Sequence, residues 1–163
     1  MLKHLTLVLL TPFLVNFAAA QPSQVIVVRH AERALEPAGD PSLSSEGHQR
    51  AELLAETLSA TGIRTIITTH FRRTNETAAP LAKRMGVTPT VLTIRRGELQ
   101  AHIAEVVAEV RKTSGTVLVV GHSDTVADIV AALSSSRPTK LCETSFANLF
   151  VVTRLCLRSR RYS

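Results

Sequence analysis

The chain has 163 residues, of which 45% are hydrophobic and 20% charged, and its formal net charge is +6. This length and composition are typical of one globular domain and argue against disordered, collagen-like and multidomain chains. No tryptophan, one tyrosine and five phenylalanines leave little aromatic surface for stacking bases, so we do not expect nucleic acid as a partner. Two cysteines without zinc-ligand spacing exclude a zinc finger and a cysteine-dense secreted scaffold.

The first twenty residues are typical of a secretory signal peptide. A lysine near the start precedes an apolar run at residues 5–17, and three alanines follow at residues 18–20. The run contains a proline and is shorter than the roughly 20 apolar residues of a transmembrane helix. We therefore expect residues 1–20 to be removed and residues 21–163 to form a single exported domain, periplasmic or secreted, without stable membrane insertion.

Apolar, β-branched runs typical of strands buried on both faces occur four times in the remaining chain. They lie at residues 24–28, 63–69, 90–94 and 116–120. Each is followed by apolar residues at i, i+3, i+4 and i+7, which is the spacing of one buried helix face. These stripes lie at residues 51–58, 78–85, 99–106 and 126–133.

The fourfold alternation of strand and helix predicts an α/β fold. Such a chain forms a mostly parallel sheet covered by helices on both faces, which is a three-layer sandwich. A last apolar stretch at residues 149–152 follows a serine-rich connection. We expect it to form an antiparallel strand at the edge of the sheet.

Basic side chains follow three of the four predicted strands, at the edge where open α/β sheets bind their ligands. The strands end in Arg29-His30, in His70 with Arg72-Arg73, and in His122 with Asp124. Arginine presents a rigid fork of donors that matches phosphate oxygens, so this set of side chains points to a phosphate site. A neutral histidine beside a clamped phosphate can attack phosphorus without a metal or other cofactor. An acid must then protonate the leaving oxygen.

Four sequence motifs resemble those of the histidine phosphatase superfamily, which includes the phosphoglycerate mutases. They are VRHAE at 28–32, LSSEGHQRA at 43–51, THFRRTNETA at 69–78 and LVVGHS at 118–123. The resemblance implies that His30 is the nucleophile that becomes phosphohistidine. It also implies that Arg29, Arg73 and His122 hold the transferring phosphoryl group. The predicted helix that opens near Thr74 could add backbone N–H groups to the anion site.

The proton donor stays open among three carboxylates. Glu98 lies near the place where phosphoglycerate mutases carry a glutamate, after the third predicted strand. Asp124 lies two residues after His122, close to where the acid phosphatase branch has its acid. Glu32 is the third candidate, although the corresponding position in the family more often supports binding or structure.

Three other histidines are interpreted as structural. We expect His48 and His70 to lie at the rim or surface, and His102, on an apolar helix face, to be a hydrogen-bonded core histidine. A metal site built from His30, His70, His122 and Asp124 is an alternative that is disfavoured because two arginines in the same pocket repel a cation.

The loops at residues 34–43 and 94–98 are short, which leaves little chain for the lid that a mutase needs to exclude water. We therefore predict a phosphomonoester hydrolase, acting on a phosphorylated small molecule or an envelope sugar phosphate. A phospho-ligand binding protein without turnover is the first alternative, and a mutase-type phosphotransferase is the second.

Cys142 and Cys156 would both lie in an oxidising compartment if the protein is exported. A disulfide between them is allowed, and two free thiols are the alternative.

Overall fold

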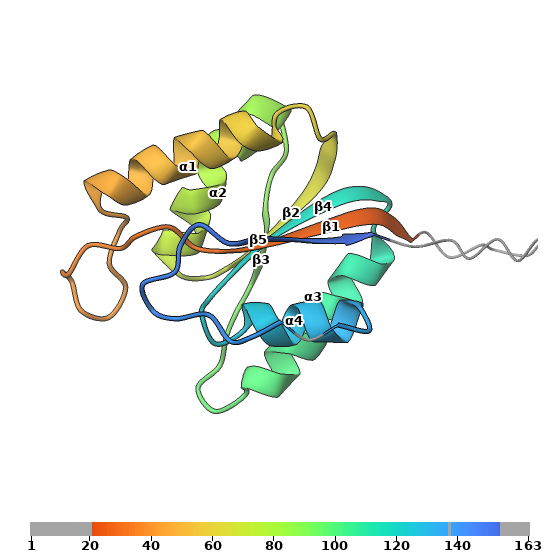
Figure 1. The fold of residues 1–163 in the computed structure, drawn as a ribbon. Coiled ribbons are helices and arrows are strands. Elements are labelled where there is room, and N and C mark those ends of the chain that lie inside the picture. Colours follow the sequence, from red (N-terminus) through yellow and green to blue (C-terminus); the bar gives the residue numbers. More distant parts are fainter. Residues whose placement is uncertain (1–20, 137, 154–163) are drawn as a thin grey trace, which may run out of the picture.

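Five strands form one mixed sheet in the order β3-β2-β4-β1-β5 (Figure 1). The structure, a computed structural model, describes residues 21–136 and 138–153, so the expected signal peptide lies outside the described residues. The strands are β1 (Pro22–Arg29), β2 (Ile63–Thr69), β3 (Thr90–Leu92), β4 (Gly115–Gly121) and β5 (Leu149–Thr153). The first four are mutually parallel and β5 pairs antiparallel with β1, which confirms the predicted edge strand.

Four helices in the described part of the chain cover the two faces of the sheet. They are α1 (Ser45–Leu58), α2 (Arg72–Met85), α3 (Leu99–Lys112) and α4 (Val126–Leu133). Figure 1 shows α1 and α2 on one face and α3 and α4 on the other, so the three-layer α/β architecture is confirmed. None of these helices has the length and apolar character needed to cross a membrane.

The two helical layers bury alternate side chains of the central strands. On one face Ile26 and Leu118 pack with Leu81 of α2, and on the other Val27 packs with Ile129 of α4. Side chains of a strand point alternately to opposite faces, so a strand covered on both sides must be apolar throughout. Burying each such side chain contributes about 1.5–3 kcal/mol, which makes these central strands a rigid support for the loops at their ends.

Strand β3 is shorter than the sequence predicts. We expected residues 90–94, but the strand ends at Leu92 because it pairs only with the last three residues of β2. Beyond it the chain turns towards the end of β2, where the Ile94 backbone N–H donates to His70 Nδ1 at 3.2 Å. The segment predicted as the end of a strand therefore forms part of the rim of the site.

Close backbone packing fixes the start of α1 against the segment that follows β1. The Ser44 backbone N–H donates to the Glu32 carbonyl at 2.9 Å, and the Ser44 side chain accepts from the Gly47 N–H at 3.2 Å as the N-cap. A Cβ atom on Gly47 would lie 2.0 Å from the Glu32 carbonyl oxygen. Only glycine fits there without movement of the backbone, which gives the serine and glycine of this motif a physical role.

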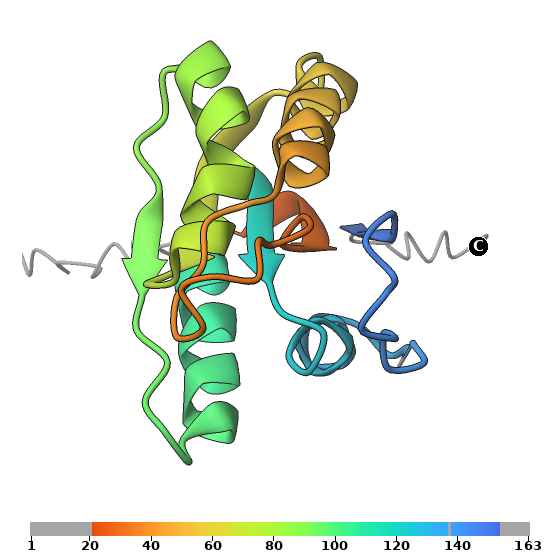
Figure 2. The same ribbon diagram turned by 90° about the vertical axis from the view of Figure 1, so that its left-hand side faces the viewer.

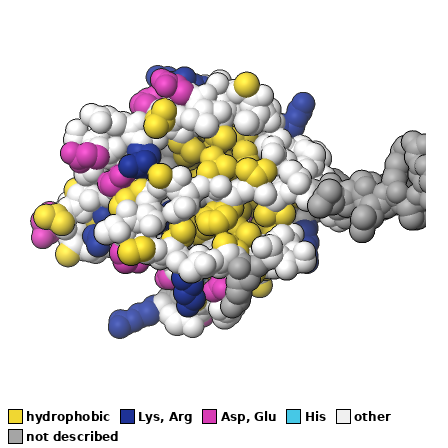
Figure 3. Space-filling view, viewed as in Figure 1, with side chains coloured by type: hydrophobic (Ala, Val, Ile, Leu, Met, Phe, Trp, Pro, Cys, Tyr) yellow, Lys and Arg dark blue, Asp and Glu magenta, His cyan; other side chains and the backbone are white. Residues whose placement is uncertain are grey.

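The edge strand β5 carries apolar side chains that face solvent. Leu149 and Val151 are exposed, and cavities of about 270 and 510 Å³ lie along the strand. Figure 3 shows apolar side chains on both sides of this strand, between α1 and α4. The basic and polar residues of the predicted site lie elsewhere, at the carboxyl ends of the parallel strands, on the side of the molecule that faces the viewer in Figure 2.

Candidate active site

The predicted site lies where the chain leaves neighbouring strands in opposite directions. Strands β1 and β4 are adjacent and parallel, but β1 leads to α1 on one face and β4 leads to α4 on the other. Such a switch point opens a crevice at the carboxyl ends of the strands. A cavity of about 440 Å³ lies there. Its polar lining consists of Arg29, His30, Arg33, Arg73, His122, Ser123, Asp124 and Glu143.

His30 lies directly after β1 and is buried, at 4% exposure. Its Nδ1–H donates to the Ala31 carbonyl at 2.7 Å, which places the lone pair on Nε2. Burial, together with the nearby charges of Arg73, Arg29 and Arg33, lowers the pKa of His30 to about 4, against the opposing effect of the Ala31 hydrogen bond. The imidazole is therefore neutral near pH 7, which the predicted role of nucleophile requires.

His122 follows β4 and faces His30, with ring centroids 5.3 Å apart in an edge-on arrangement. Its Nε2 lies 3.0 Å from Thr69 Oγ1, and its Nδ1 lies 3.5 Å from the Arg73 guanidinium. Because arginine can only donate, this Nδ1 acts as acceptor and the Nε2–H donates to Thr69. Burial, followed by His30 and Arg73, lowers the pKa of His122 to about 2, so both imidazoles are neutral in the free protein.

Arg29, the last residue of β1, is held by the segment between α4 and β5. Its Nη1 donates to the backbone carbonyls of Cys142 at 3.0 Å and Glu143 at 2.7 Å, and its Nη2 donates to the Glu143 carboxylate at 2.9 Å. The Phe146 ring lies 4.2 Å from its guanidinium carbon. The buried Nε has no hydrogen-bond partner. An unsatisfied buried donor on a charged group is costly, so this arginine has capacity for a further acceptor.

Arg73 lies in the first turn of α2 with its guanidinium over the Phe71 ring, at 4.2 Å. Asp40 lies 3.7 Å away, which is a loose ion pair. Burial lowers the pKa of Arg73, with Asp40 acting in the opposite direction. The structure thus brings Arg29, Arg73 and both histidines to one cavity, as the motif spacing predicts.

Three threonines connect the start of α2 to the ends of β1 and β2. Thr74 Oγ1 lies 3.0 Å from Thr69 Oγ1 and donates to the Phe71 and Thr69 carbonyls. Thr77 Oγ1 accepts from the Ala31 N–H at 2.9 Å and donates to the Arg73 carbonyl at 2.6 Å. These contacts are buried or partly buried, and they fix His122 and Arg73 relative to His30.

The start of α2 is less open to anions than we expected. The Arg72 N–H donates to the Asp40 carboxylate at 2.9 Å, and the Thr74 N–H donates to the Phe71 carbonyl at 3.1 Å. The loop at residues 34–43 thus occupies one donor of this helix end with a carboxylate, and the Phe71 carbonyl occupies another.

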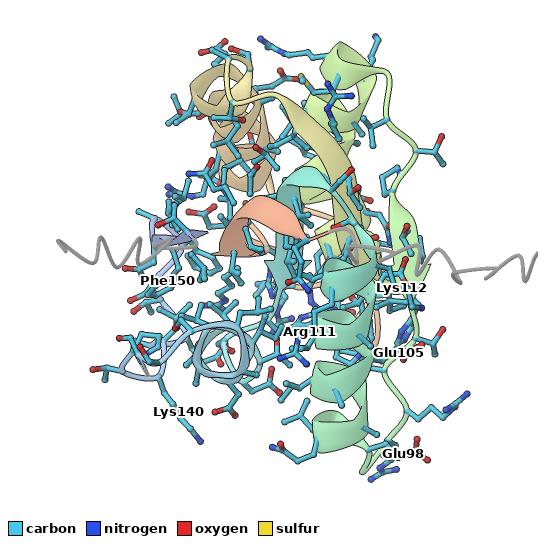
Figure 4. The ribbon with its side chains drawn as sticks, turned by 90° about the vertical axis from the view of Figure 1, so that its right-hand side faces the viewer. Glu98, Glu105, Arg111, Lys112, Lys140 and Phe150 are labelled. Atoms are coloured by element: carbon cyan, nitrogen blue, oxygen red, sulfur yellow. The ribbon has the colours of Figure 1, made fainter. Side chains whose placement is uncertain are left out.

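The structure separates the three candidate proton donors. Asp124 is exposed and lines the cavity. Glu32 points elsewhere and forms a bidentate pair with Arg50 at 2.5–2.9 Å. Glu98 precedes α3, pairs with Arg95 at 3.5 Å and lines a different cavity. Figure 4 shows Glu98 at the end of α3 opposite Lys112. Of the three, the fold brings only Asp124 to the two histidines.

Glu143 and Arg33 line the cavity although no motif indicated them. Glu143 accepts from Arg29 and, through its other oxygen, from the Ser123 hydroxyl. The Ser123 hydrogen bond and the charge of Arg29 lower the pKa of Glu143, so it is ionised near pH 7. Its distance of 114 residues from Arg29 explains why sequence spacing gives no signal.

The remaining histidines follow the prediction in part. His48 is exposed on α1, and His70 is exposed beside Phe71 at 4.0 Å between ring centroids. His102 is buried in α3 as expected, but its Nδ1 has no hydrogen-bond partner, so the prediction that it is satisfied is wrong. Burial accordingly lowers the pKa of His102.

No group of three or more histidine, cysteine, aspartate or glutamate side chains within residues 21–136 and 138–153 is placed to hold a metal ion. The alternative metal set is thus not assembled: His70 does not line the cavity that holds His30, His122 and Asp124. Cys142 is exposed, and Cys156, with which a disulfide is allowed, lies outside the described residues.

Comparison with known proteins supports the motif assignment. Residues 25–95 match the model of the histidine phosphatase superfamily (branch 1). A comparison with curated protein sequences gave no significant match. These 71 residues include the first three motifs, and the fourth lies beyond them.

Solved structures share the fold at low sequence identity. The protein histidine phosphatase SixA complexed with tungstate has a TM-score of 0.58 and 23% identity, covering 72% of this chain and 82% of that one. A mycobacterial glucosyl-3-phosphoglycerate phosphatase complexed with VO3 has a TM-score of 0.56 and 19% identity, covering 79% and 90%. Mycobacterial hydrolase 2 has a TM-score of 0.59 and 18% identity, covering 79% and 81%. Residues 25–95 thus match the histidine phosphatase superfamily (branch 1), and the described chain shares the fold of solved histidine phosphatases.

Proposed function

We propose that this protein hydrolyses phosphomonoesters through a phosphohistidine formed on His30, without a metal ion. The observation that carries the proposal is the pairing of a neutral, oriented imidazole with two guanidinium groups in one cavity. The carbonyl of Ala31 holds the proton on Nδ1 and leaves Nε2 free to attack. Arg29 and Arg73 neutralise the phosphoryl charge that would otherwise repel the nucleophile.

In the first step Nε2 of His30 forms a bond to phosphorus while the bond from phosphorus to the ester oxygen breaks. Asp124, in its protonated form, gives its proton to the leaving oxygen. Glu143 is a poorer donor because hydrogen bonds from Ser123 and Arg29 stabilise its ionised form. In the second step Asp124 accepts a proton from water, whose oxygen attacks phosphorus as the P–N bond breaks and phosphate is released.

The Nε–H of Arg29 and the protonated form of His122 can donate hydrogen bonds to the phosphoryl oxygens. The Nε of Arg29 is an unused donor, and a dianion beside His122 would favour its protonated form. The relatives complexed with tungstate and VO3 bind oxyanions on a similar fold, which supports an oxyanion site in this cavity. Hydrolysis, rather than phosphoryl transfer between substrates, is supported by the short connection between β3 and α3, which leaves little chain there for a lid.

The proposal includes export and a substrate outside the cytoplasm, such as an envelope sugar phosphate or another phosphorylated small molecule. It rests on the signal-like pattern of residues 1–20. The test is the N-terminal residue of the protein recovered from its producing cell, which we expect to be Gln21. An intact Met1 would contradict export through a cleaved signal.

Activity is tested with an aryl phosphate in the presence of EDTA. We expect turnover that persists with EDTA and is abolished by His30→Ala, while His48→Ala, at an exposed histidine, retains it. Turnover that depends on a metal or survives His30→Ala would contradict the mechanism. Phosphate binding without turnover would favour the non-catalytic phospho-ligand binding protein instead.

A further inference from the structure

The segment between α4 and β5 contacts Arg29. Together with Arg73, this arginine forms the proposed phosphate clamp. Arg29 donates to two of its backbone carbonyls and stacks on Phe146. The Glu143 carboxylate adds a further contact, with one oxygen on Arg29 Nη2 and the other on the Ser123 hydroxyl. This carboxylate therefore bridges the ends of β1 and β4, next to His30 and His122.

The bridge places a negative charge where the proposed reaction needs to bind one. Glu143 lines the same cavity as both histidines and occupies donors that a phosphoryl group would use. Two anions that share one guanidinium repel each other, and the repulsion is strong in a partly buried cavity. A phosphate dianion and the carboxylate of Glu143 must compete for Arg29.

The carboxylate can move away while the guanidinium stays in place. The Glu143 side chain is 78% exposed while the Arg29 side chain is 3% exposed, so the carboxylate has solvent to move into. Arg29 keeps its position without it, because the carbonyls of Cys142 and Glu143 and the Phe146 ring still hold the guanidinium. Positioning Arg29 is therefore not the main effect of this carboxylate.

We propose that Glu143 is a specificity-determining residue that competes with inorganic phosphate for Arg29 and so keeps the reaction product weakly bound. The inference rests on the proposed function, because it assumes that Arg29 binds the phosphoryl group. After hydrolysis the carboxylate returns to Arg29 and Ser123 and displaces the free dianion. An organic phosphate offsets the same competition through contacts that its alcohol group makes with the rest of the roughly 440 Å³ cavity.

The test is titration calorimetry of the full domain with inorganic phosphate at pH 8, in wild type, Glu143→Gln and Glu143→Ala. We expect both variants to bind phosphate about tenfold more tightly, since each removes one competing charge. Product inhibition by phosphate should strengthen by the same factor. The matched control is Glu52→Gln, which removes the charge of another exposed glutamate paired with an arginine, at 3.1 Å from Arg84. It should bind phosphate as the wild type does.

Unchanged or weaker phosphate binding in both Glu143 variants would overturn the inference, and weaker binding would assign the carboxylate a structural role. The Arg73→Gln variant tests the proposed phosphate clamp separately from Glu143. If wild type binds phosphate and Arg73→Gln does not, the clamp stands and the Glu143 variants decide the inference alone. If wild type and every variant fail to bind phosphate, the clamp and the inference are both wrong.

Discussion

Two buried neutral histidines at the candidate active site should make this fold unusually sensitive to mild acid. The pKa of His30 is lowered from about 6.5 in the unfolded chain to about 4, and that of His122 to about 2. Below pH 6.5 these two histidines are therefore protonated in the unfolded chain but still neutral in the folded protein. The free energy of unfolding must fall as the pH falls through this range.

The magnitude follows from the size of the two shifts. Between pH 8 and pH 5 each histidine lowers the free energy of unfolding by about 2 kcal/mol, so the pair accounts for about 4 kcal/mol. This is a large fraction of the 5–15 kcal/mol by which domains are typically stable. The lowered pKa values of Glu32 and Glu143 act in a different window, since their contribution is present above about pH 4.5 and is lost below it.

The assay is urea unfolding at pH 8 and pH 5 in phosphate-free buffer, because a bound anion would stabilise the folded state. His122→Gln should reduce the difference between the two pH values by about 2 kcal/mol, whereas His48→Gln, at an exposed histidine, should leave it unchanged. If His122→Gln retains the full pH dependence, His122 is not held neutral by its burial. The electrostatic description of the site would then be wrong.

Three further substitutions test separate parts of the site. Gly47→Ala places a Cβ 2.0 Å from the Glu32 carbonyl oxygen, so we expect a loss of about 1–3 kcal/mol in urea unfolding; unchanged stability would show that the α1 start is not tightly packed. Asp124→Asn should slow hydrolysis of phenyl phosphate about 10²- to 10⁴-fold but that of 4-nitrophenyl phosphate much less, because a good leaving group needs no acid; an equal loss on both would exclude Asp124 as the proton donor. Arg73→Gln should weaken phosphate binding about 10- to 100-fold by calorimetry, and an unaffected Kd would remove Arg73 from the clamp.

The fold could be predicted from the sequence because its central strands are covered on both sides. Burial on two faces demands continuous apolar runs, and the helices between them must show one apolar stripe each, so both patterns are visible in the sequence. Strand β3 was overextended because it lies at the edge, where it pairs only with the last residues of β2. At an edge, apolar residues such as Ile94 can leave the sheet and line a cavity instead.

The residues of the site were predictable where they follow central strands. Arg29, His30 and His122 are fixed by β1 and β4, and Arg73 by the first turn of α2. Glu143 comes from an irregular segment that no periodicity describes, and its position depends on long-range contacts with Arg29 and Ser123.

Sequence position left the choice among three carboxylates open. Glu98 lies near the end of a strand in the sequence, but β3 ends early and the chain turns, which leaves this side chain beside Arg95 on another cavity. Asp124 stays at the site because His122 and the start of α4 lie on either side of it. Distance along the chain is a good guide only where the backbone follows a regular element.

The central claim is that His30 carries the phosphoryl group, and the most direct measurement is to trap that intermediate. Protein is mixed with an aryl phosphate and quenched in alkali within one turnover, because phosphohistidine survives base. Mass spectrometry of peptides then locates the added phosphoryl group, which serves as the label. We expect one phosphoryl group on the peptide that contains His30, and none on that peptide in His30→Ala. Turnover without label on His30, or label on another residue, would contradict the account.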